Sequence, residues 1–353
     1  MAEALRLTRA GKLVEAAAIL KTGMAAAARP SSAQTGAGAV IDLETIRRAP
    51  AAASGRFEDK VYAGPAGRLA YRLYVPAGAT AGLPLIVMLH GCTQSPEDFA
   101  RGTGMNRLAD ETGLLVAYPH QTQAANAQKC WNWFRPGDQQ RDRGEPALIA
   151  GITREIIAEY RADPARVYVA GLSAGGAAAA IMAATYPDLY AAVGVHSGVP
   201  CGAARDLSSA MVAMRSGGRA RPSRGGAGAF VPLITFHGDR DMTVSEANSR
   251  ALVAEALQAA GGALTTRVES GRSAGGRAYT RALGADETGR VAVEQWTVEG
   301  LGHAWSGGDD AGTFADPNGP DASREMVRFF LDHPRAPGTR PTVVVDRWNP
   351  GES

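Results

Sequence analysis

The chain has 353 residues, a nearly balanced net charge of +2 and 45% hydrophobic residues. This length and apolar content suffice for one substantial core. The charge balance does not indicate a nucleic-acid surface, and no apolar run reaches the length of a membrane span. The first nine residues alternate charged and apolar side chains, which is not the continuous apolar stretch of a secretory signal.

The N-terminal region, residues 1–55, is predicted to hold a helix and a linker. Residues 3–21 have the periodicity of an amphipathic helix, which we expect to pack on the body of the protein or on a partner. Residues 22–55 are rich in Ala, Ser, Gly and Pro and are interpreted as the linker. The main domain is predicted over 56–333, and residues 334–353, with four prolines, are expected to be an extended tail.

The main domain begins with strand patterns. Residues 57–75 predict two strands with period-two character, which we expect to form an antiparallel edge. The apolar run 84–89 has the composition of a buried parallel strand and ends in His90 and Gly91. Further along, isoleucines recur at helical spacing and mark the buried side of a helix predicted over 147–160.

A serine motif stands between the next two predicted elements. A β-branched run at 166–170 predicts a strand, and the alanine-rich segment 176–186 predicts a helix. Between them, GLSAG at 171–175 matches G-x-S-x-G in the strand–turn–helix context of a nucleophile elbow. The glycines on either side permit a tight turn, and the helix N-terminus favours a developing oxyanion. Ser173 is therefore the candidate nucleophile.

The candidate acid follows a further buried strand, predicted over 231–236. Serine nucleophiles of this elbow type are followed in the chain first by the acid and then by the histidine. The spacing favours Asp241, because a two-residue turn after His-Gly lets its side chain point back across the sheet edge. Asp239 is expected to cap that turn. His237 is interpreted as structural, since it precedes the acid.

The candidate base follows a strand predicted over 291–298, in a glycine-rich loop that contains His303. Only this histidine, of six, has both the required order and the loop setting. A solvated loop histidine is the alternative. The segment 215–228, dense in Gly, Arg and Ser, is interpreted either as a lid or as a plain surface loop.

Two backbone N–H groups are the candidate oxyanion donors. One belongs to Ala174, directly after the serine, and the other to Cys92, in the loop after the strand at 84–89. Cys92 and Cys130 fall in loops near the predicted site mouth, so a bridge that leaves Cys201 unpaired is one hypothesis. Three reduced thiols are the alternative, because sequence does not give connectivity. We expect no metal site, since no C-x-x-C or His cluster occurs.

Large flat side chains near these motifs are candidates for a substrate pocket. Trp131, Trp133 and Trp305 would suit the apolar part of an ester as walls of its acyl or alcohol site. Core packing is the alternative for the first two.

With these residues laid out, the chain resembles the polyhydroxybutyrate depolymerase esterase family, an α/β-hydrolase group that also includes feruloyl-type and acetylxylan-type esterases. The resemblance covers about residues 57–333, and the segment CWNWF is its most distinctive part. The matching segments are LHGCTQ (89–94), CWNWF (130–134), GLSAGG (171–176), HGDRD (237–241) and GHAWSGG (302–308).

The resemblance implies an α/β-hydrolase fold, a doubly wound, mostly parallel sheet with helices on both faces, which the alternation of strands and helices also favours. It implies a serine carboxylic ester hydrolase with Ser173, Asp241 and His303 as its triad and with no cofactor. It also supports pairing of Cys92 with Cys130. The implied substrate is a short-chain polyhydroxyalkanoate, such as a 3-hydroxybutyrate oligomer, or a related small ester.

Several alternatives stay open from the sequence. Larger secreted depolymerases of this type carry a signal peptide, a linker and a polymer-binding domain, and none is visible here, so soluble oligomers or small esters are expected. The family suggests an extracellular protein, whereas the missing signal leaves the cytoplasm open. The rival functions are a feruloyl or acetyl carbohydrate esterase, an acyltransferase, an amide hydrolase and a non-catalytic binding protein, the last disfavoured by the intact triad.

Overall fold

The computed structural model describes residues 55–218, 230–261 and 264–335. The predicted N-terminal helix and linker, most of the segment predicted as a lid or loop, and nearly all of the predicted tail lie outside these residues. Within the described ranges, no helix combines the length and apolar character needed to span a bilayer.

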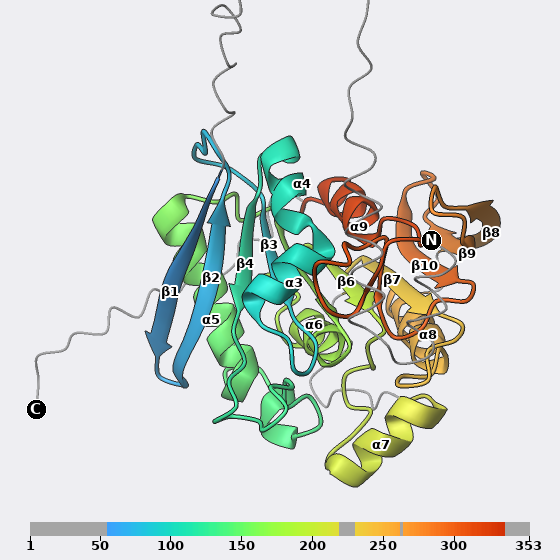
Figure 1. The fold of residues 1–353 in the computed structure, drawn as a ribbon, viewed down its shortest axis with the longest axis horizontal. Helices are drawn as coiled ribbons and strands as arrows, with labels where there is room; N and C mark the ends of the chain where they lie inside the picture. Colours follow the sequence, from blue (N-terminus) through green and yellow to red (C-terminus); the bar gives the residue numbers. More distant parts are fainter. Residues whose placement is uncertain (1–54, 219–229, 262–263, 336–353) are drawn as a thin grey trace, which may run out of the picture. The chain divides into compact units, whose positions relative to one another are not determined.

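A ten-stranded sheet organises the described region (Figure 1), in the order β1-β2-β4-β3-β5-β6-β7-β10-β9-β8. The strands from β4 to β10 in this order pair in parallel, and the two outer strands at each edge pair antiparallel. The strands are β1 (Arg56–Gly64), β2 (Gly67–Val75), β3 (Leu85–Leu89), β4 (Leu115–Pro119), β5 (Val167–Leu172), β6 (Ala192–His196), β7 (Leu233–Gly238), β8 (Thr265–Arg272), β9 (Ala278–Ala285) and β10 (Val291–Val298), with a separate parallel pair β11 (Trp305–Ser306) and β12 (Ala315–Asp316).

Helices pack on both faces of the sheet (Figure 1), as the sequence predicts. One core cluster joins the sheet to α5, α6 and α8, and the other joins it to α3, α4 and α9. The helices are α3 (Pro96–Thr103), α4 (Met105–Thr112), the 3₁₀ turn η2 (Pro136–Gln139), α5 (Gly144–Tyr160), α6 (Ala174–Thr185), α7 (Leu207–Ser216), α8 (Ala247–Ala259) and α9 (Ala322–Leu331).

Strand β3 shows why the central strands are apolar throughout. Leu85, Val87 and Leu89 belong to one core cluster, and Ile86 and Met88 belong to the other. A parallel strand that is covered by helices on both faces has no solvent-facing side. The continuous apolar run at 84–89 therefore predicts this strand correctly.

The order of the strands gathers the loops that carry chemistry. From β3 the chain moves outward to β4, and from β5 onward it moves in the opposite direction along the sheet. Ligand sites in such sheets lie at the carboxyl ends of the strands where this reversal occurs. Leu89 pairs with Gly171, and Leu172 pairs with His196. The loop after β3 and the turn that holds Ser173 therefore leave the same edge side by side.

The predicted elements match the structure at the centre of the sheet, whereas the strands at one of its edges were not predicted. Strand β10 has the predicted bounds, while α5 begins three residues earlier than predicted. The antiparallel pair β1–β2 is confirmed. The sequence patterns give no range for strands β4, β6, β8 and β9 or for helices α3, α4, α7, α8 and α9. Seven of the eight residues of β8 are exposed, so its sequence carries no apolar alternation by which to recognise it.

Candidate active site

Ser173 stands in a strained turn between β5 and α6. Its backbone has φ 59° and ψ −119°, a conformation that is rare for any residue other than glycine. The Ser173 N–H donates to the carbonyl oxygen of His196 at 2.9 Å, which fixes the turn against the end of β6. The first N–H groups of α6, including that of Ala174, have no acceptor within the helix. The predicted nucleophile elbow is thus present in the backbone.

Two glycines make this turn possible. A Cβ atom on Gly171 would lie 2.3 Å from the backbone of Gly175, and a Cβ atom on Gly175 would lie 1.9 Å from the carbonyl oxygen of Leu89. Both positions therefore exclude every other residue type, which gives the G-x-S-x-G pattern its physical reason.

Asp241 and His303 meet although 62 residues separate them. His303 Nδ1 donates to Asp241 Oδ2 at 2.7 Å, and Asp241 Oδ1 accepts from the N–H groups of Thr243 and Val244 at 2.9 and 2.8 Å. Burial opposes ionisation of this carboxyl, but the hydrogen bond and charge of His303 and the two backbone N–H groups outweigh it, so the pKa of Asp241 is lowered. Asp239 instead accepts from the Gly300 N–H at 2.6 Å.

His237 supports the loop that carries Asp241. Its buried ring donates from Nε2 to the carbonyl oxygen of Val244 at 2.7 Å. Burial lowers the pKa of His237, which favours the neutral ring. This arrangement agrees with the structural role predicted for this histidine.

His196 is a site residue that the sequence analysis missed. Besides accepting the Ser173 N–H through its carbonyl oxygen, it accepts the Ser306 N–H at its ring Nε2 at 3.0 Å. The ring stacks on Trp305 with centroids 5.1 Å apart. His196 thereby links the serine turn to the segment just after His303. Burial lowers the pKa of this ring well below its ordinary value, so it stays neutral.

The loop after β3 passes beside the serine. A Cβ atom placed on Gly91 would lie 3.6 Å from Ser173 Cβ. The Gly91 N–H donates to Gln94 Oε1, and the Gln94 N–H donates to the carbonyl oxygen of Gly91. The Thr93 N–H donates to the carbonyl oxygen of Gln128. Cys92 is the remaining residue of this loop, which keeps its N–H as the candidate second oxyanion donor.

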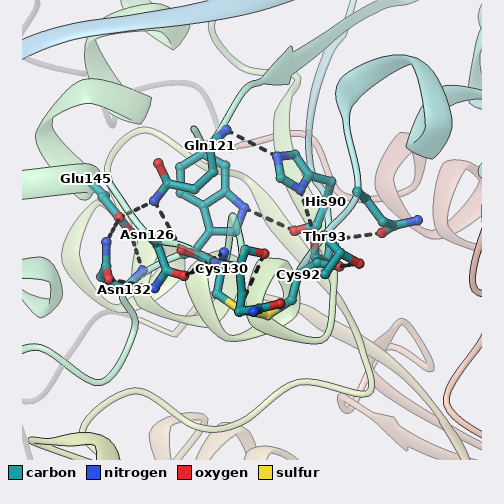
Figure 2. Close-up of a disulfide and its surroundings, with 12 residues drawn as sticks. His90, Cys92, Thr93, Gln121, Asn126, Cys130, Asn132 and Glu145 are labelled. Carbon is teal, nitrogen blue, oxygen red and sulfur yellow. Dashed lines mark hydrogen bonds between the residues drawn. A yellow bond between two sulfur atoms is a disulfide. The ribbon is translucent and has the colours of Figure 1, made fainter. Parts of the chain in front are cut away.

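A disulfide joins this loop to the segment at 130–134. Figure 2 shows the bond between Cys92 and Cys130, whose S–S distance is 2.02 Å. The predicted pairing is confirmed, and Cys201 is the unpaired cysteine of the described residues.

The tryptophans correct one expectation. Trp131 is 0% exposed and donates from its indole N–H to the carbonyl oxygen of His90, and Trp305 is 1% exposed and donates to the hydroxyl of Ser323. Both indoles fill the core and satisfy their polar atom there, so the prediction that they form pocket walls is wrong. Trp133 is also buried, and its role as a wall stays a prediction.

Phe314 presents the aromatic surface that these tryptophans do not. Its ring is 45% exposed and lies edge-on to the His303 ring, with centroids 6.3 Å apart. Gln94 connects the loop of Phe314 to the loop after β3. Its Oε1 accepts the Gly91 N–H, and its Nε2 donates to the carbonyl oxygen of Thr313. Asp98 accepts the Thr313 N–H at 3.0 Å and holds the same loop. No sequence motif pointed to Phe314.

Comparison with known proteins decides the family. A family model described as "Esterase PHB depolymerase" matches residues 69–278, more than half of the chain. The chain belongs to this family.

Among the described residues, no group of three or more His, Cys, Asp or Glu side chains is arranged to hold a metal ion.

Relatives in this esterase family carry related names. A poly(3-hydroxyalkanoate) depolymerase C of Paucimonas lemoignei is 35% identical over 75% of the chain and 64% of its own length. A poly(3-hydroxybutyrate) depolymerase of Ralstonia pickettii is 29% identical over 64% of the chain and 49% of its own length. The chain thus spans less than two thirds of either relative.

A solved structure confirms the fold. The acetyl xylan esterase from Aspergillus awamori aligns over 79% of this chain and all of its own, with a TM-score of 0.63 and 20% sequence identity. At that identity the likeness concerns architecture alone. The α/β-hydrolase fold expected from the sequence is therefore correct.

Proposed function

We propose that the chain is a serine carboxylic ester hydrolase with Ser173, His303 and Asp241 as its triad. The observation that carries the proposal is the 2.7 Å hydrogen bond from His303 to buried Asp241, at the same sheet edge as a serine held in a nucleophile turn. Because Asp241 occupies Nδ1, the Nε2 atom of His303 is the one available to take the serine proton.

The proposed reaction has two halves. As Ser173 Oγ bonds to the ester carbonyl carbon, its proton passes to His303, and the carbonyl oxygen becomes an oxyanion held by the Cys92 and Ala174 N–H groups. The alcohol leaves with the proton of His303, and an acyl-enzyme remains. Water then attacks this ester through the same histidine, releasing the acid and restoring the serine. The reaction needs no cofactor.

The proposed substrates are short-chain polyhydroxyalkanoate oligomers, such as those of 3-hydroxybutyrate, or related small esters. The names of the Paucimonas lemoignei and Ralstonia pickettii relatives support this class. A carbohydrate esterase is the second candidate, since a probable acetylxylan esterase A of Aspergillus fumigatus is 34% identical over 139 residues.

The test is hydrolysis of p-nitrophenyl esters from acetate to octanoate, beside 3-hydroxybutyrate oligomers, methyl ferulate and acetylated xylan. We expect Ser173→Ala to abolish activity and Asp241→Asn to lower kcat about 10⁴-fold, because the amide no longer stabilises the charged histidine. Asp239→Asn is the matched control and should retain activity. A Ser173→Ala variant that turns over like the wild type would refute the proposal.

A further inference from the structure

We propose that His90 and Glu145 are positioning residues that orient the Cys92 N–H for the oxyanion. The inference rests on the proposed function and adds two residues that do not touch the substrate. It is carried by a set of hydrogen bonds that runs from half-buried Glu145 through Gln121 and Asn132 to buried His90, here called the Glu145 network (Figure 2).

The first step concerns the peptide that joins Gly91 to Cys92. His90 Nδ1 lies 2.7 Å from the carbonyl oxygen of Gly91, which also accepts the Gln94 N–H at the longer distance of 3.4 Å. The described chain contains no cis peptide bond, so the carbonyl of Gly91 and the N–H of Cys92 point in opposite directions within one rigid plane. A ring that holds this carbonyl therefore also fixes the direction of the N–H. Glycine lacks a side chain that would restrict this rotation by itself.

His90 is the donor in the hydrogen bond between its Nδ1 and the carbonyl oxygen of Gly91. The Gln121 N–H donates to His90 Nε2 at 3.1 Å, and a backbone N–H has no other role in a hydrogen bond. Nε2 must therefore be unprotonated, which places the ring hydrogen on Nδ1, facing Gly91. The ring is 1% exposed, and burial lowers the pKa of His90 to about 4. The ring is thus neutral at neutral pH, with this one hydrogen to donate.

The third step leads to Glu145, at the start of α5. Its carboxylate accepts three hydrogen bonds, from Gln121 Nε2 at 2.5 Å and from the backbone and side-chain nitrogens of Asn132 at 2.7 and 2.6 Å. All three partners are donors. A carboxylate accepts from all of them, whereas an amide in its place would turn its own N–H₂ group toward at least one.

Glu145 also holds the segment 130–132, which contacts the loop after β3. Its partner Asn132 follows Trp131, whose indole N–H donates to the carbonyl oxygen of His90 at 3.1 Å. Cys130, in the same segment, is bonded to Cys92 and accepts from Gln121 Nε2 at 3.2 Å. One half-buried carboxylate therefore fixes both the segment that is bonded to Cys92 and the residue that sets the tautomer of His90.

Ionisation of this half-buried carboxyl group is costly to the fold. Burial raises the pKa of Glu145 to about 7, and the nearby charge of Asp138 adds to the effect. Carboxyl groups with such shifts are more frequent where function requires them. Orientation of the Cys92 N–H toward the oxyanion is the function that we infer for this carboxylate.

A matched pair of variants separates positioning from packing. In His90→Asn the amide nitrogen takes the place of Nδ1 and keeps the bond to Gly91, while the bond from Gln121 is lost. In His90→Gln the amide oxygen takes the place of Nε2 and keeps the bond from Gln121, while the donor to Gly91 is lost. We expect kcat for p-nitrophenyl butyrate within about fivefold of wild type for Asn, and about 30- to 100-fold lower for Gln, with KM changed less than about threefold in both.

Glu145→Gln tests the link to α5. We expect kcat to fall about tenfold alone, and to fall little further when the change is added to His90→Gln, because both act on the same peptide. Thr153→Val is the control on the same helix, since this buried hydroxyl bonds to Ile149 and Tyr190. It should leave kcat within about twofold. Effects of Glu145→Gln and His90→Gln that multiply would overturn the inference.

The wild-type protein gives an independent test. Nitrogen-15 NMR of labelled histidines, with His90→Asn for assignment, should show the His90 hydrogen on Nδ1 at neutral pH. A hydrogen on Nε2, or an active wild type whose His90→Gln variant keeps its kcat, would overturn the inference while leaving the proposed function standing. A wild type without Ser173-dependent ester hydrolysis would overturn both.

Discussion

Ser173 and Phe314 both have positive φ values, 59° and 52°, and both belong to the candidate site. Such a conformation costs a bulky side chain on the order of 1 kcal/mol, and it persists only where the surroundings enforce it. For Phe314 the surroundings are Asp98 and Gln94, which bond to the adjacent Thr313. We expect this half-exposed ring beside His303 to contact the substrate.

Replacement of Phe314 should separate stability from activity. We expect Phe314→Gly to change the free energy of unfolding by less than about 1 kcal/mol, because relief of the strain offsets the lost contacts and the flexibility of glycine. KM for p-nitrophenyl octanoate should rise about tenfold, which corresponds to about 1.4 kcal/mol, while KM for the acetate changes little.

Phe314→Leu is the control for this prediction, since it keeps an apolar side chain in the same backbone and should retain most of the octanoate affinity. The measurements are denaturant unfolding and steady-state kinetics of the three proteins. Destabilisation of Phe314→Gly by 3 kcal/mol or more, as for a core aromatic, would instead assign the ring a structural role.

The residues predicted from the sequence are those that local patterns mark. Ser173 stands in a motif whose glycines are required by close backbone contacts, and Asp241 and His303 follow strands in a fixed order. Glu145 and His196 gave no such signal, and Gln94 stands in the matching segment 89–94 without a predicted role. The partners of these polar residues lie elsewhere in the chain, and only the tertiary structure brings them together.

At the scale of elements, the same distinction separates the sheet centre from its edge. Central strands such as β3 and β5 are apolar on both faces, so their sequences identify them. The edge strand β8 is held by its pairing to β9, and its side chains are mostly exposed. Backbone pairing with a neighbouring strand has no requirement for apolar side chains, and that element is therefore hidden from a sequence pattern.

Glu294 connects the edge of the sheet at β9 and β10 to helix α9. Its side chain, on β10, is fully buried and accepts from Arg281 on β9 at 2.9 Å and from Arg328 on α9 at 2.7 Å. We expect Glu294→Gln to lower the free energy of unfolding by roughly 2–4 kcal/mol, because two arginines then lose their buried charged partner. Denaturant unfolding measures this change.

Glu325→Gln is the matched control, since Glu325 pairs with the same Arg328 from a more exposed position. We expect it to cost less than about 1 kcal/mol. Equal effects of the two substitutions would show that burial of Glu294 adds nothing to the stability of the ion pairs.

At the scale of the whole molecule, buried neutral histidines predict how stability depends on pH. Burial lowers the pKa of His90 to about 4 and lowers those of His196, His237 and His333 as well. Each ring accepts protons in the unfolded chain near pH 6.5 but not in the folded one, so protonation favours unfolding. Stability should therefore fall as the pH drops from about 6.5 toward 4. Glu145, whose pKa is raised to about 7, has the opposite effect over part of this range.

Guanidinium unfolding at pH values from 7.5 to 5 measures this dependence. We expect His90 to contribute a loss of roughly 1–2 kcal/mol by pH 5, the other buried rings to add to this loss, and Glu145 to offset part of it. His90→Asn removes one titrating ring and should flatten the curve, whereas Glu145→Gln removes the offset and should steepen it. The two variants thus shift the pH dependence in opposite directions. A stability that is constant across this range would show that these rings become protonated within the folded protein.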